Sequence, residues 1–137
     1  ASQDGGISLV PDICFVIRNK EGKEALFWVE IDCARQTIGG VPYIRGNSLL
    51  HKYVRYEKVL EDQGWKRSVP TTAQAGRILT ITENSRHLNT ICRKTTSVLH
   101  YPELFLFTTH QEILRYGVLR FAIWNSVLSD SPASLLS

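Results

Sequence analysis

The sequence predicts an α/β domain in which helices flank a mixed β-sheet. Near the start of the chain, two segments with strand-like patterns enclose a polar turn that contains Gly22. The second half then alternates strand, helix, strand and helix, which is typical of a layered sheet with right-handed crossovers. With 137 residues, 43% hydrophobic and 21% charged, the chain has the composition of one globular domain. This composition excludes disordered, collagen-like and coiled-coil proteins.

The first predicted element is a β-hairpin. Ile13, Phe15 and Ile17 alternate with other side chains, and residues 25–31 are rich in aromatic and β-branched residues. The charged segment 19–24 between them is predicted to form the turn.

A loop and a long helix are expected next. The glycines at 39, 40 and 46 and Pro42 predict a loop over residues 36–46. Asn47 or Ser48 would then cap a helix that extends to about Asp62. Gly64 is the predicted stop signal. The apolar stripe of this helix consists of Leu49, Tyr53, Tyr56 and Leu60.

The second half begins with a predicted loop at 70–76 and a strand at 77–82. Asn84 or Ser85 is expected to cap a helix that extends to about Leu99. The apolar run within 103–108 is typical of a parallel strand that is buried on both faces. A short helix at 111–116 and a last strand at 119–127 complete the prediction.

We expect one domain over residues 9–128, with a flexible lead-in at 1–8 and a C-terminal tail at 129–137. The chain contains no methionine, which indicates a fragment or a processed chain, so further domains of the same full-length protein are expected.

The cysteines and the apolar runs predict a cytoplasmic protein. Cys14, Cys33 and Cys92 form no C-x-x-C pair, and their odd number is typical of a reducing compartment. The apolar runs are far shorter than the roughly 20 residues that cross a bilayer. No export leader is recognised, so no membrane contact is expected.

Three acidic residues flank the predicted hairpin. Asp12 precedes the first strand, while Glu30 and Asp32 end the second and project to the same face. With the turn centred near residue 21, Asp12 becomes the cross-strand neighbour of Glu30. Opposed carboxylates repel unless a cation lies between them, and Mg²⁺ or Mn²⁺ prefers such oxygens. The pattern predicts a metal site between Asp12 and Glu30, with water-exposed strand-end acids as the alternative.

Lys52 lies inside the apolar stripe of the first long helix rather than opposite it. Either its stem snorkels past the edge of the core, or its ammonium group reaches the carboxylates and holds a water or a phosphate. Tyr53 and Tyr56 on the same face are interpreted as core aromatics, with phosphate or base contacts as the alternative. A Tyr nucleophile has no supporting motif beside it.

Basic residues recur in the two long predicted helices. The default interpretation is a solvated helix surface, and the alternative is a set of phosphate contacts for DNA. The net charge of +3 permits nucleic-acid binding without arguing for it. The four histidines lack metal-ligand spacing and are interpreted as surface or helix-end residues. The candidate DNA-binding residues are Arg55, Lys58, Arg86, Arg93 and Lys94.

The hairpin resembles the core of the PD-(D/E)XK nucleases, the restriction-endonuclease-like superfamily. Pro11 and Asp12, the turn, and the segment Val29-Glu30-Ile31-Asp32 carry this resemblance. The chain from about residue 10 to 127 is also similar to the replication-relaxation proteins of plasmids and other mobile elements. The residues that carry this second resemblance are Lys52, Tyr53, Tyr56, the strand 78–82, Ser85, Arg86 and residues 104–109.

The resemblance implies a restriction-endonuclease-like fold and an Mg²⁺- or Mn²⁺-dependent deoxyribonuclease. Asp12, Glu30 and Asp32 would bind the metal, Lys52 would stabilise the phosphate or position water, and Tyr56 would be a supporting contact. The superfamily places a Lys two positions after the Glu, where this chain has Asp32. Lys52, from the neighbouring helix, is the residue nominated in its place.

The sequence therefore predicts a DNA-processing domain that hydrolyses phosphodiester bonds, as an endonuclease or a nicking enzyme. The first alternative is a catalytically silent module of the same fold that docks DNA or assembles in plasmid replication or transfer. The second is a protein-interaction domain with no role on DNA, which would self-associate, for example as a homodimer. Asp32 in the place of the Lys favours the silent module, whereas the paired acids and Lys52 favour the nuclease.

Overall fold

The computed structural model describes residues 10–32, 42–63, 65–69 and 71–136, with the backbone alone at 42–48, 68 and 130. A six-stranded sheet with the order β1-β2-β3-β4-β5-β6 forms its centre. β2, β3 and β4 run parallel to one another, and each of the other neighbouring pairs is antiparallel. The mixed α/β architecture in a single domain is confirmed. The strands are β1 (Ile13–Arg18), β2 (Glu24–Ile31), β3 (Gly76–Thr82), β4 (Phe105–Thr109), β5 (Trp124–Ser126) and β6 (Ser129–Ala133).

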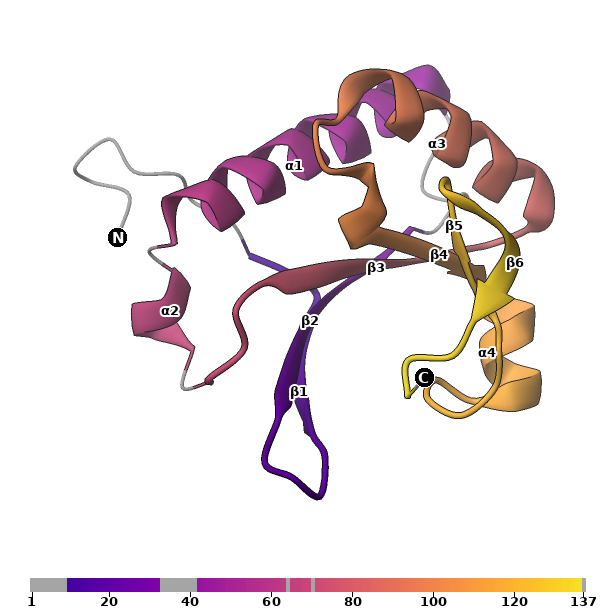
Figure 1. The fold of residues 1–137 in the computed structure, drawn as a ribbon. Coiled ribbons are helices and arrows are strands. Elements are labelled where there is room, and N and C mark those ends of the chain that lie inside the picture. Colours follow the sequence, from indigo (N-terminus) through magenta and orange to yellow (C-terminus); the bar gives the residue numbers. More distant parts are fainter. Residues whose placement is uncertain (1–9, 33–41, 64, 70, 137) are drawn as a thin grey trace.

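Helices cover the sheet on both faces (Figure 1). One face packs against α1 and α3 around Tyr53, Tyr56 and Phe105, whereas the other packs against α4 and the C-terminal segment around Phe27 and Trp124. None of the helices in the described part of the chain is long and apolar enough to cross a membrane. The helices are α1 (Pro42–Asp62), α2 (Trp65–Ser68), α3 (Ser85–Val98), the 3₁₀ helix η3 (Pro102–Leu104) and α4 (His110–Tyr116).

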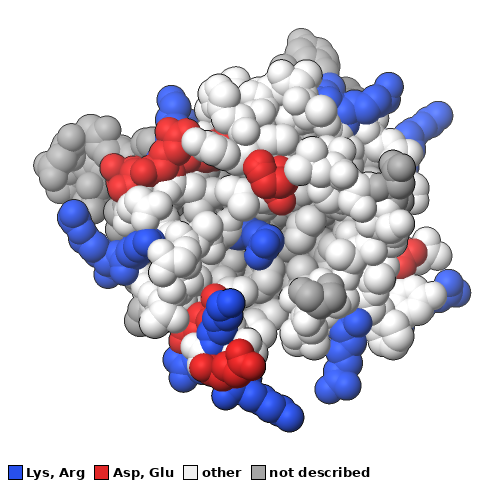
Figure 2. Space-filling view, viewed as in Figure 1, with Lys and Arg blue, Asp and Glu red and all other residues white. Residues whose placement is uncertain are grey.

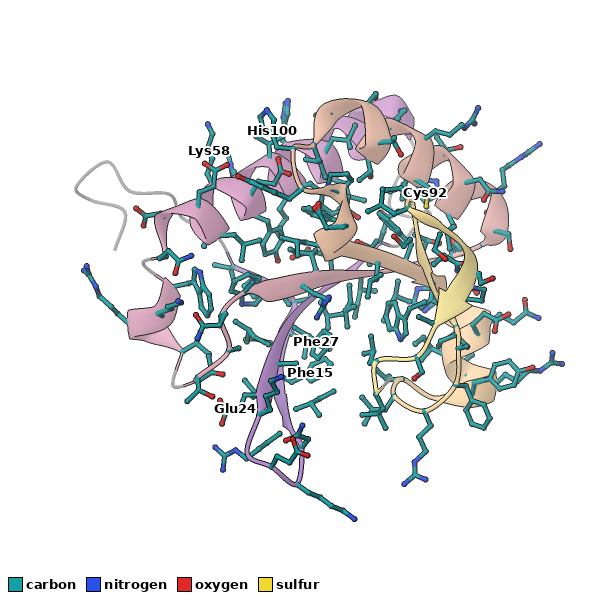
Figure 3. All side chains as sticks on the ribbon, viewed as in Figure 1. Phe15, Glu24, Phe27, Lys58, Cys92 and His100 are labelled. Atoms are coloured by element: carbon teal, nitrogen blue, oxygen red, sulfur yellow. The ribbon has the colours of Figure 1, made fainter. Side chains whose placement is uncertain are left out.

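The predicted hairpin is confirmed, with its predicted register. Ile13 pairs with Val29 and Arg18 pairs with Glu24, so the turn is centred at residue 21. Gly22 has a φ of 84°, a left-handed conformation that glycine adopts without strain. Phe15 and Phe27 stack with ring centroids 5.1 Å apart on the face that α4 covers (Figure 3).

The parallel part of the sheet also follows the sequence pattern. Asn84 caps α3 as predicted, because its side chain accepts a hydrogen bond from the backbone N–H of His87 at 2.9 Å. Phe105 and Phe107 are fully buried in β4, which lies between β3 and β5. The 3₁₀ turn η3 occupies the first residues of the predicted strand, so β4 begins at Phe105.

Several predicted boundaries are wrong. α1 begins at Pro42 rather than at residue 47 or 48, because a proline in the first helical turn lacks only an N–H that would have no partner there. The predicted end of α1 at Asp62 is confirmed, and there Gln63 takes the left-handed conformation expected of a glycine, with φ 63°. The expected tail contains β6, and the strand expected at 119–127 is limited to β5. The lead-in 1–8, Gly64 and most of the 36–46 loop lie outside the described residues.

The carboxylate of Glu24 makes the free energy of unfolding depend on pH in the acid range. Its carboxylate accepts hydrogen bonds from Thr71 Oγ1 at 2.6 Å and Thr72 N at 2.8 Å, and it lies 2.5 Å from Arg18 Nη2. These bonds, that from Thr71 foremost, lower the pKa of Glu24 from 4.5 to about 2. A lowered pKa stabilises the fold above the ordinary value, and this contribution is lost as the pH falls from 4.5 towards about 2.

We therefore expect Glu24→Gln to flatten the acid limb of the stability profile. The measurement is the urea midpoint of both proteins at several pH values from neutral down through this window. The wild-type advantage over Glu24→Gln should shrink as the pH falls. Two profiles that stay parallel would show that the carboxylate does not carry this dependence.

Candidate functional site

The site is centred on Glu30, near the carboxyl end of β2. Leu26 and Trp28 precede it on the same face of the strand and belong to the core under α1. Glu30 continues this alternation, so its carboxylate also faces α1, and the residue is only 4% exposed. A charged group at such a position is costly unless it is paired and hydrogen-bonded.

Helix α1 supplies both partners of Glu30. Lys52 Nζ lies 2.8 Å from Glu30 Oε1, and Tyr56 donates its hydroxyl hydrogen to Glu30 Oε2. The two donors are four residues apart and therefore lie one above the other on one helix face. Lys52 Nζ also donates to the backbone oxygen of Val10 at 3.1 Å, so it ties the segment before β1 to the end of β2.

Asp12 lies beside this pair and is itself exposed. Its Oδ2 accepts a hydrogen bond from Ile31 N at 2.8 Å, and its own N–H donates to Val29 O at 3.1 Å. The side chain therefore extends the β1–β2 pairing by one further hydrogen bond at the end of the hairpin.

Asp32 lies on the same side of the sheet as Glu30 and is 3% exposed. Its backbone N–H donates to Ile81 O at 2.8 Å, which continues the pairing of β2 with β3 past the end of the strand. His87, in the first turn of α3, places Nε2 at 2.5 Å from Asp32 Oδ2. The His87 imidazole is therefore the side chain that α3 brings into contact with this carboxylate.

Two tyrosine hydroxyls lie among these carboxylates. Burial raises the pKa of Tyr56 well above its ordinary value, and the hydrogen bond to Glu30 and the charges of Glu30 and Asp12 raise it further. Burial likewise raises the pKa of Tyr53, whose hydroxyl contacts Thr80 Oγ1, and the charges of Asp32 and Glu30 add to it. Both phenols therefore stay protonated, which suits a hydrogen-bond donor and opposes a nucleophilic role.

These contacts join three of the five residues that the sequence nominates for catalysis, Glu30, Lys52 and Tyr56, whereas Asp12 and Asp32 flank them with partners of their own. We call Asp12, Glu30, Asp32, Lys52, Tyr56 and His87 the carboxylate cluster. Each of the three acids contacts protein groups: Asp12 the backbone of Ile31, Glu30 the side chains of Lys52 and Tyr56, and Asp32 the imidazole of His87. In the described part of the chain, no group of three His, Cys, Asp or Glu side chains is arranged to hold a metal ion. In this arrangement the cluster does not fit Mg²⁺ or Mn²⁺.

Sequence reasoning missed His87, which was interpreted as a surface or helix-end residue. The signal lies in the topology, since β2 and β3 are parallel neighbours and α3 starts directly after β3. The first turn of α3 must then lie beside the residues that follow β2. It is this neighbourhood that brings His87 to Asp32.

The predicted DNA-binding residues lie on the two helices that cover one face of the sheet. Arg55, Lys58, Arg86 and Arg93 are exposed, and Lys94 is half-buried. Lys58 points away from the sheet on the outer side of α1 (Figure 3). Helix α3 contains no acidic residue, and Figure 2 shows blue groups at the upper right, where α3 lies, and red groups at the upper left.

Comparison with known proteins finds no match: no family model matches the chain, and neither a curated protein nor a solved structure matches it. The likeness to PD-(D/E)XK nucleases therefore stays a prediction from the residues quoted for it.

Proposed function

We propose that this chain is a DNA-binding or assembly module of restriction-endonuclease-like fold that does not cleave DNA. The observation that carries the proposal is the occupation of both Glu30 oxygens by Lys52 Nζ and Tyr56 OH. In a hydrolytic centre this carboxylate would have to be open to a metal ion or a water. Here it is 4% exposed and fully engaged by α1.

The pairing of Glu30 is costly to undo. Removing one partner from a buried ion pair leaves an uncompensated charge, which typically costs about 3–5 kcal/mol. The side chain of Lys52 is 29% exposed and that of Glu30 is 6% exposed, so the carboxylate would bear most of this cost. The Glu30–Lys52 ion pair therefore holds together β2, α1 and the segment before β1.

Binding to DNA would use the outer surface of α1 and α3. These helices contact each other and present Arg55, Lys58, Arg86 and Arg93 to solvent. Exposed cations of this kind attract the phosphate backbone and release counterions, so affinity falls with salt. The exposed acids Glu61 and Asp62 lie at the C-terminal end of α1. The basic surface is therefore limited to the rest of α1 and to α3.

This proposal predicts that Arg55→Gln, Arg86→Gln and Arg93→Gln together weaken DNA binding at least about tenfold at low salt. The slope of log affinity against log salt should fall by about one for each phosphate contact removed. The measurement is fluorescence anisotropy of a labelled DNA duplex at four or more salt concentrations.

The matched control changes the same amount of charge elsewhere. Lys20, Lys23 and Lys66 are exposed on the hairpin turn and on α2, outside α1 and α3. Lys20→Gln, Lys23→Gln and Lys66→Gln together should leave the slope nearly unchanged. Equal losses in the two triple variants, or no binding by the wild type at low salt, would contradict the proposal.

A second candidate is the hydrolysis of DNA phosphodiester bonds. The observation that favours it is that Lys52, nominated in place of the missing Lys, contacts Glu30 beside the exposed carboxylate of Asp12. Cleavage of supercoiled plasmid in the presence of Mg²⁺ or Mn²⁺ separates this candidate from the first.

A further inference from the structure

A pocket of about 490 Å³ lies at the carboxyl ends of β3 and β4, apart from the carboxylate cluster. Ser85 and Leu88 of α3 line one side, and Glu112 and Tyr116 of α4 line another. The segment that contains Phe121, Ala122, Ile123 and Asn125 closes it together with Pro132. Its volume is within the range of about 300–1,000 Å³ that small-molecule sites occupy.

The topology of the sheet explains why a pocket forms here. β3 and β4 are parallel neighbours, yet the helix after β3 packs on one face and the helix after β4 packs on the other. Figure 1 shows α3 and α4 on opposite sides of the sheet beyond these strand ends. Two helices that diverge from neighbouring parallel strands leave a crevice between them, and ligands of open α/β sheets bind in such crevices. β2 and β3 leave none, because α1 and α3 cover the same face.

Two aromatic rings border the pocket and are unusually exposed. Phe121 is 53% exposed and Tyr116 is 39% exposed, with ring centroids 5.3 Å apart. The guanidinium carbon of Arg115 lies 5.9 Å from the centre of the Tyr116 ring. Exposed aromatic rings next to a cavity offer flat faces on which a planar ligand stacks.

Two groups of the lining can only accept a hydrogen bond from a ligand, the Glu112 carboxylate and the side-chain oxygen of Asn125, whereas the hydroxyls of Ser85, Thr109 and Tyr116 and the amide of Asn89 can donate as well. Among the described residues of the lining, Glu112 is the charged one, and none is a Lys or an Arg. The amide nitrogen of Asn125 already donates to Phe107 O at 3.1 Å and to Ile123 O at 3.4 Å, so its side-chain oxygen is the group left for a ligand. A phosphate or a carboxylate would find no cation in this lining. A neutral ring that carries donors fits it.

We propose that this pocket binds a nucleobase with an exocyclic amino group, adenine or cytosine. The ring stacks on Phe121, with the Tyr116 ring, tilted by 45° from that of Phe121, at its edge, and the amino group donates to Glu112 or to the side-chain oxygen of Asn125. Carboxylates accept from the cytosine amino group, and asparagine pairs with adenine, in known base recognition. The proposal is independent of DNA binding on the α1–α3 layer, because a nucleoside is uncharged and its affinity does not depend on counterion release.

Calorimetric titration of the whole chain with adenosine, cytidine and thymidine tests the proposal. Adenosine or cytidine should bind at least about tenfold more tightly than thymidine, which lacks an exocyclic amino group. Phe121→Ala should weaken binding of the amino-bearing nucleoside at least about fivefold, as the loss of one stacking partner does. Glu112→Gln should reduce the preference over thymidine, because the carboxamide also offers a donor.

Leu114→Ala is the matched control, since Leu114 is 87% exposed on the same helix and outside the lining. Thermal unfolding of each variant checks that the fold is retained. The absence of binding by all three nucleosides up to about 10 mM would overturn the proposal. So would equal binding of thymidine, or equal effects of Phe121→Ala and Leu114→Ala.

A second arm identifies the source of the base. A short single strand of deoxyadenosines is titrated beside free adenosine, at low and at high salt. Tighter binding of the strand that Phe121→Ala weakens would assign the pocket to a base within a nucleic acid. Binding of adenosine alone would assign it to a free nucleoside. In either case the base pocket stands, whether or not the duplex assay on the helical layer succeeds.

Discussion

Replacing Lys52 with methionine is expected to destabilise the protein by about 3 kcal/mol. The methionine keeps most of the side-chain volume but leaves the Glu30 carboxylate, 4% exposed, with Tyr56 as its remaining side-chain donor. Water can reach part of the vacated position, because the side chain of Lys52 is 29% exposed, and this places the loss at the lower end of the range for buried pairs. Urea unfolding at neutral pH measures the change.

Two further variants separate loss of the pair from loss of a lysine. Lys58→Met removes an exposed lysine from the same helix and should change stability by less than about 0.5 kcal/mol. Glu30→Gln together with Lys52→Met removes both charges, so the loss should be smaller than the sum of the two single losses. If Lys52→Met lowers the free energy of unfolding no more than Lys58→Met does, the Glu30–Lys52 pair is not what holds β2, α1 and the segment before β1 together.

Gly76→Ala is expected to destabilise the protein by about 2 kcal/mol, even though alanine is the better residue for a strand interior. A Cβ at this first residue of β3 would lie 2.7 Å from Cζ3 and 3.0 Å from Cε3 of Trp28. The indole cannot easily move away, since it stacks on Tyr56 at 5.7 Å and meets Trp65 edge-on at 5.6 Å. Urea unfolding again gives the magnitude.

The clash can be tested in a second background. Trp28→Phe removes the outer ring of the indole, to which all three of the nearest atoms belong. In that background Gly76→Ala should cost much less than in the wild type. An equal cost in both backgrounds would locate the problem in the backbone of β3 rather than in its contact with Trp28.

The fold was largely predictable because its signals are local. The alternation of residues 13–17 and the Gly22 turn determine the hairpin register, and Asn84 determines the start of α3. The errors occur where no local signal decides. Gln63 takes a conformation that glycine normally takes, and the polar residues of β6 form a strand because β5 offers them an antiparallel partner.

The residues of the site were predictable, but their contacts were not. Hairpin geometry brings Asp12 near Glu30, and helical spacing brings Lys52 and Tyr56 to one face, so the sequence could place these four residues together. It could not say which groups the carboxylates bind, because that depends on how α1 packs across β2. His87 and the pocket between α3 and α4 depend on strand order, which no short motif encodes.

The measurement that tests the central claim most directly combines binding and cleavage on one gel. Supercoiled plasmid is incubated with Mg²⁺ or Mn²⁺ and enough protein to retard it, then examined again after the protein is removed. We expect retarded plasmid that is still supercoiled once the protein is gone, with the same result for Glu30→Gln. Nicked or linear plasmid that a chelator and Glu30→Gln both prevent would show instead that the carboxylate cluster opens to catalyse hydrolysis.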